Sequence, residues 1–106
     1  MFVRILRMKL KPDGAEGIER TVDDEVVPVV KKFAGFAGQV TMVSSDRKEA
    51  IGISLWDRKE SAETYKKEQS AAVLKALGKH VEGKPELQTY EVTNTTFEKL
   101  LGRKAA

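Results

Sequence analysis

Hydrophobic and polar positions along the chain follow two periods, which divide it into six predicted elements. Alternating positions and short apolar runs predict four strands, over residues 2–11, 39–45, 50–56 and 87–95. Apolar stripes at helical spacing predict two helices, over residues 16–33 and from the turn at Asp57 to about Leu77. The resulting order, β-α-β-β-α-β, is typical of a ferredoxin-like α+β domain with an antiparallel sheet.

Local signals mark where these elements end. The Pro-Asp-Gly run at residues 12–14 predicts a turn, and Pro28 predicts a kink or a division of the first helix. The Asp-x-x-Glu pattern at residues 57–60 matches a capping box at the start of the second helix. Gly78 predicts the end of that helix, and a polar loop over residues 79–86 then leads to the last strand.

The strands carry apolar side chains on both of their faces. In the first strand, Leu6 and Met8 belong to one face, and Val3 and Ile5 belong to the other. Two helices cover only one face of a four-stranded sheet, so the second apolar face needs another cover. The simplest cover is a second copy of the same sheet. We therefore predict a homodimer whose sheets pack face to face, forming a dimeric α/β barrel with a cavity between sheet and helices in each subunit.

A length of 106 residues predicts a single domain over residues 1–106. Its last part, residues 97–106, is a polar tail that carries a few apolar side chains. Such a tail commonly docks on its own domain or on a partner subunit.

Composition and charge exclude several classes of function. The chain has no Cys, which excludes disulfides, thiolate metal sites and Cys nucleophiles. Its 19 basic residues are mixed with 16 acidic ones, and the net charge of +3 is weak evidence for a nucleic-acid partner. Arg4, Arg7, Lys9 and Lys11 interrupt the apolar start, so we predict no signal peptide, no membrane span and a cytoplasmic protein.

Three runs of residues resemble the antibiotic biosynthesis monooxygenase (ABM) family, and together they extend over nearly the whole chain. FAGFAG at residues 33–38 resembles a Gly-Phe-x-Gly turn, GISLWD at 52–57 a strand ending in Trp, and TYEV at 89–92 the family's last strand. The resemblance implies a small dimeric α+β barrel. It does not fix an activity, because the family includes cofactor-free oxygenases of aromatic polyketides, quinol monooxygenases, haem-degrading enzymes and an isomerase of signalling sugars.

The haem-degrading members of the family carry three residues that this chain lacks. They have an Asn on the first strand, a Trp nine residues after the strand-ending Trp, and a His ten residues further along. The first strand here has no Asn, and the other two positions hold Tyr65 and Lys75. Haem degradation is therefore disfavoured.

Tyr65 and Arg4 are the leading catalytic candidates. The resemblance places Tyr65 at a pocket-facing helix position where family members often carry His or Trp, and a phenol there would bind a substrate oxygen or stabilise an enolate. The alternative is a core Tyr with its hydroxyl at the edge. Arg4 shares a strand face with apolar neighbours, so it should be paired or bind an anion, unless its head reaches water.

Trp56, Leu6 and Tyr90 are the predicted substrate-binding residues. Trp56 would stack on a flat aromatic substrate, or it would cap the barrel end or pack at the dimer interface. Leu6 shares the strand face of Arg4, and Tyr90 lies in the last strand. His80 is a weaker catalytic candidate: it is the only His, and imidazole titrates near neutral pH, but its polar surroundings predict exposure. One His excludes a His-rich metal centre, and we expect neither metal nor cofactor.

Other proteins share this order of elements. Acylphosphatases need an Arg and an Asn in a glycine-rich first loop, and residues 11–15 contain neither. RNA recognition motifs need stacking aromatic side chains on the central strands, whereas residues 51–55 are aliphatic. Dimeric ligand-sensing and stress-response barrels have the same fold and need no catalytic residue.

Two hypotheses follow from the sequence. The first is an ABM-like, cofactor-independent monooxygenase or related enzyme that acts on a small aromatic or quinone-like molecule. The second is a non-catalytic ligand-binding or assembly domain with the same dimeric core. A pocket with polar groups converging at Tyr65 and Arg4 would favour the enzyme.

Overall fold

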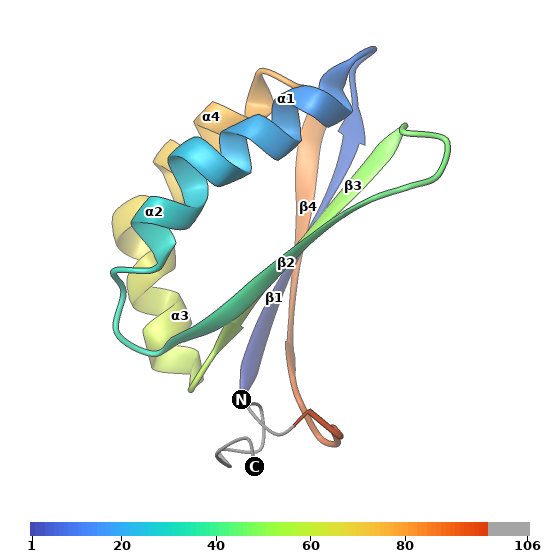
Figure 1. Cartoon of the computed structure of the whole chain (residues 1–106). Coiled ribbons are helices and arrows are strands. Elements are labelled where there is room, and N and C mark those ends of the chain that lie inside the picture. Colours follow the sequence, from blue (N-terminus) through green and yellow to red (C-terminus); the bar gives the residue numbers. More distant parts are fainter. Residues whose placement is uncertain (98–106) are drawn as a thin grey trace.

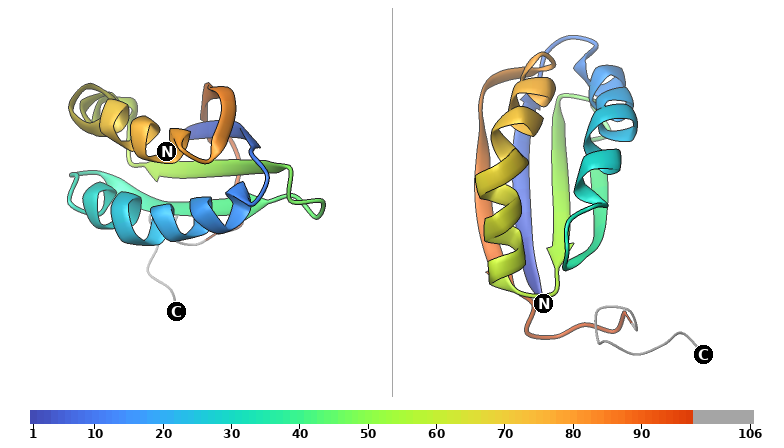
Figure 2. Two further views of the ribbon diagram at one scale, coloured as in Figure 1. Left: turned by 90° about the horizontal axis from the view of Figure 1, so that it is seen from above. Right: turned by 90° about the vertical axis from the view of Figure 1, so that its left-hand side faces the viewer.

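The computed structural model describes residues 1–97, and the predicted C-terminal tail lies outside the described residues except for Phe97. Strands β1 (Phe2–Leu10), β2 (Phe36–Val43), β3 (Glu49–Trp56) and β4 (Val81–Glu91) form one antiparallel sheet in the order β2-β3-β1-β4. Two long helical segments cover one face of this sheet (Figures 1 and 2). The predicted ferredoxin-like α+β fold is confirmed.

The first helical segment consists of α1 (Gly14–Thr21), a π-helical turn η1 (Val22–Val26) and α2 (Val27–Val30). Pro28 has no backbone N–H, and its ring would collide with the carbonyl four residues earlier in a regular α-helix. The chain accommodates Pro28 with the π turn just before it, in which the Val27 N–H bonds to the Val22 carbonyl. The predicted interruption at Pro28 therefore takes the form of one π-helical turn, which contains one residue more than a regular α-helical turn.

The second helical segment also contains a π turn. It consists of α3 (Lys59–Tyr65), η2 (Lys66–Ser70) and α4 (Ala71–Gly78). The predicted capping box is wrong: no side chain caps α3, and Asp57 instead accepts a 2.6 Å hydrogen bond from the Ser61 hydroxyl. Because the π turn adds a residue, the inner face of α4 is rotated, so that Ala72 is exposed and Leu74 faces the sheet.

The predicted polar loop over residues 79–86 is wrong, because β4 already begins at Val81 and it ends at Glu91. Its pairing with β1 shifts register between Arg7 and Lys9, and Gly83 has φ 68° in this stretch. Since β4 lies at the edge of the sheet, its polar residues and Pro85 are tolerated there. Gly and Pro predicted a loop, but they form a bulge in an edge strand.

The Gly-Phe-x-Gly turn has a steric reason. Gly35 has φ 84°, and its carbonyl accepts a 2.8 Å hydrogen bond from the Asp57 N–H. A Cβ at this position would collide with the Asp57 carboxylate and the Ser61 hydroxyl. The turn thereby fixes the start of β2 against the start of the second helical segment.

Gly35→Ala is expected to lower the free energy of unfolding by about 2 kcal/mol or more, because it combines backbone strain with a collision. Denaturant titration measures this loss. Gly78→Ala is the control, since nothing lies within 4 Å of a Cβ built there, and its stability should stay close to that of the wild type. Equal stability of the two variants would contradict the steric reason for the turn.

Two clusters form the core between the sheet and the helices. One gathers aliphatic side chains around Ile18 and Leu77, and the other gathers aromatic side chains around Trp56 and Tyr65. The candidate site lies between these two clusters.

Candidate functional site

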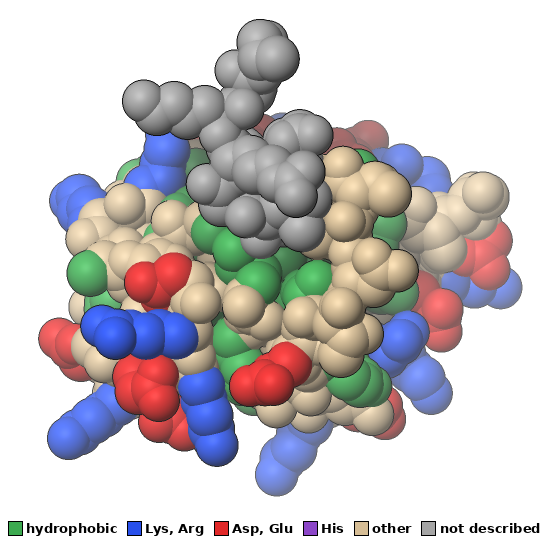
Figure 3. Space-filling model, turned by 90° about the horizontal axis from the view of Figure 1, so that it is seen from below, with side chains coloured by type: hydrophobic (Ala, Val, Ile, Leu, Met, Phe, Trp, Pro, Cys, Tyr) green, Lys and Arg blue, Asp and Glu red, His purple; other side chains and the backbone are tan. Residues whose placement is uncertain are grey.

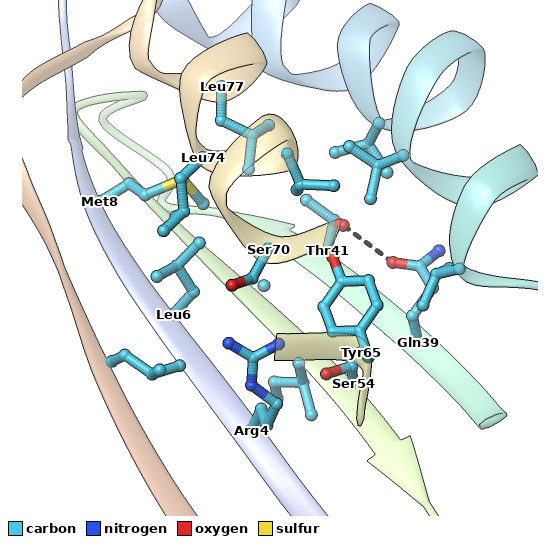
Figure 4. A pocket seen from close by; sticks show the side chains of 17 residues that line it. Arg4, Leu6, Met8, Gln39, Thr41, Ser54, Tyr65, Ser70, Leu74 and Leu77 are labelled. Atoms are coloured by element: carbon cyan, nitrogen blue, oxygen red, sulfur yellow. Dashed lines mark hydrogen bonds between the residues drawn. The ribbon is translucent and has the colours of Figure 1, made fainter. Parts of the chain in front are cut away.

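A pocket of about 100 Å³ lies between the helix-covered face of the sheet and the two helical segments (Figure 4). Its wall is mainly aliphatic, and the two π turns lie on its helical side, η1 with Val22 and Val26 and η2 with Ser70. Leu87 on β4 lines the pocket and is 38% exposed, so the pocket reaches the surface at that edge. π turns are frequent at functional sites, which makes this pocket the candidate.

Arg4 and Tyr65 face each other across this pocket. Arg4 projects from β1 and is 9% exposed, and its guanidinium carbon lies 5.1 Å from the centre of the Tyr65 ring. This geometry is a cation–π contact. Within residues 1–97, neither the guanidinium nor the phenol hydroxyl has an ion pair or a hydrogen bond to a third residue, and the contact between the two groups shifts the pKa of both. Both groups are therefore available to a ligand.

The other polar side chains of the pocket have partners already. The Trp56 indole N–H donates to the Ser54 hydroxyl at 3.1 Å, and the Ser70 hydroxyl donates to the Lys66 carbonyl at 2.7 Å. On β2, the Thr41 hydroxyl donates to the Gln39 side-chain oxygen at 3.0 Å (Figure 4). Each of these residues has at least one protein partner, and Arg4 and Tyr65 are the charged or titratable groups in the wall.

Burial controls the ionisation of both groups. It raises the pKa of the Tyr65 phenol above 10.0, and the charge of Arg4 partly opposes this shift. Burial also lowers the pKa of the Arg4 guanidinium below its usual value, and the neighbouring Tyr65 partly opposes this shift. A guanidinium stays protonated in proteins, so at neutral pH the site presents a cation and a neutral phenol donor.

The raised pKa of Tyr65 makes stability depend on pH. The folded state keeps the phenol proton in a pH range where the unfolded chain has released it, so the unfolded state binds fewer protons. The free energy of unfolding is therefore expected to fall as the pH rises above about 10, the ordinary value for this group. Tyr65→Phe should reduce this slope in denaturant titrations at several pH values. An unchanged slope would contradict the assignment to Tyr65.

The structure brings together three of the six predicted site residues. Arg4, Tyr65 and Leu6 line the pocket. Trp56 is fully buried and does not line it, although its ring lies 5.2 Å from the ring of Tyr65. Trp56 therefore packs against the Tyr65 ring within the core and does not line the pocket.

Tyr90 and His80 lie outside the pocket. Tyr90 is 49% exposed on the opposite face of the sheet, where its hydroxyl donates to Gln88. His80 packs against Gly17, where a Cβ would collide with the imidazole, and its Nε2 lies 3.2 Å from the Thr21 hydroxyl. This arrangement attaches the beginning of β4 to α1 and gives His80 a packing role.

The sequence analysis missed several lining residues, among them Ser54, Ser70, Leu74 and Leu87. The strand register gives a signal for Ser54, because it pairs directly with Arg4. Ser70 is the last residue of the η2 turn and Leu74 follows it, and regular helical spacing does not place them on the inner face.

Gly52 keeps part of the pocket open. It lies on β3 with ordinary strand geometry, and a Cβ built there would meet only the Met8 methyl group, at 4.0 Å. Gly inside a strand marks a place where a ligand or another backbone approaches. Here the missing side chain leaves space on the pocket wall.

The described part of the chain contains no group of three or more His, Cys, Asp or Glu side chains placed to hold a metal ion. None of its helices is long and apolar enough to cross a membrane.

Comparison with solved structures finds the same fold in proteins described as monooxygenases or oxygenases. The ActVA-Orf6 monooxygenase of Streptomyces coelicolor, in complex with nanaomycin D, is 15% identical with a TM-score of 0.78, over 91% of this chain and 90% of that one. SnoaB, a cofactor-independent oxygenase of Streptomyces nogalater, is 14% identical with a TM-score of 0.75, over 90% and 95%. A Nitrosomonas europaea protein described as an antibiotic biosynthesis monooxygenase is 12% identical, with a TM-score of 0.74, over 89% and 100%.

The chain has the fold of the antibiotic biosynthesis monooxygenases. At 10–15% identity this likeness concerns the fold, and it does not establish an activity or a substrate. No family model matches the sequence, and no curated protein sequence matches it either.

Proposed function

We propose that this chain is a monooxygenase or related enzyme that needs no cofactor and acts on a small aromatic or quinone-like molecule. The observation that carries the proposal is the pair of Arg4 and Tyr65, whose guanidinium and hydroxyl line an apolar pocket and have no protein partner besides each other among the described residues. An oxyanion of the substrate would bind Arg4 and accept a hydrogen bond from Tyr65. Leu6 and Met8 would hold the carbon skeleton and exclude water.

The oxidant in this proposal is dioxygen, and the electrons come from the substrate. A ring C–H of a hydroquinone becomes C–OH while the hydroquinone is oxidised to the quinone: one oxygen atom of dioxygen enters the product, and the other leaves as water with two hydrogens. Arg4 stabilises the negative charge of the reacting enolate or phenolate, which is a large effect in a site sheltered from water. The ABM fold of this chain is compatible with this chemistry.

Oxygen uptake in the presence of a substituted hydroquinone tests the proposal. Arg4→Met and Tyr65→Phe should each lower kcat/KM at least about tenfold, since each removes a hydrogen bond to the charged form of the substrate. Arg20→Met and Tyr90→Phe are controls, because Arg20 is exposed on α1 and Tyr90 lies on the opposite face of the sheet, where Phe keeps the apolar ring. Uptake that equals the uncatalysed rate, or that the four variants change equally, would overturn the proposed activity.

A non-catalytic ligand-binding or assembly domain is the second candidate. One observation favours it: among the described residues that line the pocket, only Arg4 and Tyr65 are titratable, and neither serves as a general base at neutral pH. Ligand binding without oxygen uptake would support this second function.

A homodimer completes the proposal. The sheet face opposite the helices carries Val40, Met42 and Tyr90, which are 46%, 44% and 49% exposed, and the partly buried Ile51 and Ile53 lie beside them. Hydrophobic side chains also gather in the centre of the end of the molecule where β4 finishes (Figure 3). An apolar face of this kind favours packing against the sheet of a second copy.

A further inference from the structure

Arg4 is a cation without a counter-charge. It is 9% exposed, and the lining residues of the pocket include no Asp or Glu. Its neighbours in the sheet ladder are Ser54 and Thr89, neither of which carries a charge. Buried charges in proteins are normally paired, and the Tyr65 ring compensates only part of the lost hydration. The pocket therefore lacks a negatively charged partner for Arg4.

The pocket also lacks a group that could create this negative charge on a neutral ligand. Proton abstraction at neutral pH needs a carboxylate, a neutral imidazole or an amine within reach. The described lining residues include no Asp, Glu, His or Lys, and the Tyr65 phenol holds its proton. A ligand that pairs with Arg4 must therefore enter already ionised.

The size of the pocket limits the rest of the ligand. Its volume is about 100 Å³, and its wall consists mainly of aliphatic side chains, among them Leu6, Met8, Leu74 and Leu77. An apolar cavity of roughly 150 Å³ accepts one benzene molecule. The pocket is smaller than that cavity but opens beside Leu87, so a single ring fits with part of its surface at the opening, and a larger skeleton would extend out of the enclosed space.

We infer that the pocket selects a small organic anion, with a carboxylate or phenolate oxygen at Arg4 and Tyr65 and an apolar body no larger than a single ring. This inference deepens the proposed function, because it names the class of molecule that binds. It rests on the proposed function for the reaction that the bound molecule undergoes. A planar carboxylate matches the fork of the guanidinium and can accept two parallel hydrogen bonds. The Tyr65 hydroxyl would donate a third.

Benzoate and benzamide are suitable probes, because they have nearly the same shape and only benzoate is charged. Calorimetry on the full chain should give a dissociation constant for benzoate of about 1 mM or lower, and binding of benzamide at least about tenfold weaker. Trp56 supplies a second readout, since it is the only Trp and its ring lies 5.2 Å from that of Tyr65. Its fluorescence should change with benzoate at the same midpoint.

Three variants locate the binding. Arg4→Met should weaken benzoate at least about tenfold and bring it close to benzamide, whereas Arg20→Met, at an exposed position on α1, should bind as the wild type does. Gly52→Val fills the pocket on a strand that favours β-branched residues, so it should block benzoate while the melting temperature stays at or above the wild-type value.

Four outcomes would overturn the inference: equal binding of benzoate and benzamide, tight binding of benzoate to Gly52→Val, binding of inorganic phosphate as tight as that of benzoate, or no binding of any probe. The proposed function fails separately. If benzoate binds as expected but ring-containing anions cause no oxygen uptake, the monooxygenase is overturned and the anion pocket stands. If oxygen uptake requires a neutral substrate that benzoate does not inhibit, the anion pocket is overturned and the monooxygenase stands.

Discussion

Replacing Arg4 by Met is expected to make the free protein more stable while it weakens the binding of an anionic ligand at least about tenfold. The guanidinium is nearly enclosed, has no acidic partner in the described structure and loses part of its hydration, as the direction of its pKa shift shows. Apolar replacements of buried charges are often stabilising. Two effects limit this stabilisation: the pocket is open to water at Leu87, and the substitution removes the contact with Tyr65. We therefore expect the free energy of unfolding to rise by about 1–2 kcal/mol.

This gain corresponds to a rise of about 5–10 °C in melting temperature for a domain of this size, measured by calorimetry without ligand. Arg20→Met is the control, and it should change the melting temperature little, because Arg20 is exposed on α1, away from the proposed dimer face. Lower stability of Arg4→Met would show that the cation is well compensated in the free protein. The unsatisfied charge would then no longer support a ligand site.

Met42→Lys is expected to convert the proposed dimer into a monomer. Met42 is 44% exposed on the face of the sheet without helices, and it pairs with Ile51 in the ladder. In a symmetric dimer each substitution would place two ammonium groups in an apolar interface without partners. Burying such a charge costs several kcal/mol, which exceeds what a small interface can lose.

Light scattering after size-exclusion chromatography measures this change directly. Ala72→Lys is the control, since Ala72 is an exposed residue on α4, on the helical side of the molecule. The wild type and Ala72→Lys should be dimers at concentrations where Met42→Lys is a monomer. A monomeric wild type, or a dimer that survives Met42→Lys, would rule out packing through this face of the sheet.

The sequence predicted those parts of the fold that depend on side-chain periodicity. The alternating positions of β1 and β3 and the 3.6-residue stripes of the helices identified their elements and their order. The beginning of β4 was missed because Gly83 and Pro85 normally signal a loop, and only the edge position of this strand makes them acceptable. The inner face of α4 was partly missed because a π turn at Lys66–Ser70 has no signal in hydrophobic periodicity.

The sequence also predicted some residues of the candidate site and missed others. A charged residue among apolar neighbours singled out Arg4, and helical spacing put Tyr65 on the inner stripe. The sequence did not show that Trp56 lies behind Tyr65, that Tyr90 lies on the opposite face, or that His80 fills a notch at Gly17. Each of these facts depends on strand register or on packing between elements far apart in the chain.

The sequence by itself thus determined the fold class and singled out Arg4 as a charged residue among apolar neighbours, because periodicity and the cost of burying charge act on each segment separately. The tertiary structure decided which residues form the pocket, how large it is and which hydroxyls already have partners. Those properties arise where two helical segments and four strands meet. The spacing of residues along one element carries no information about their distances to residues of another element.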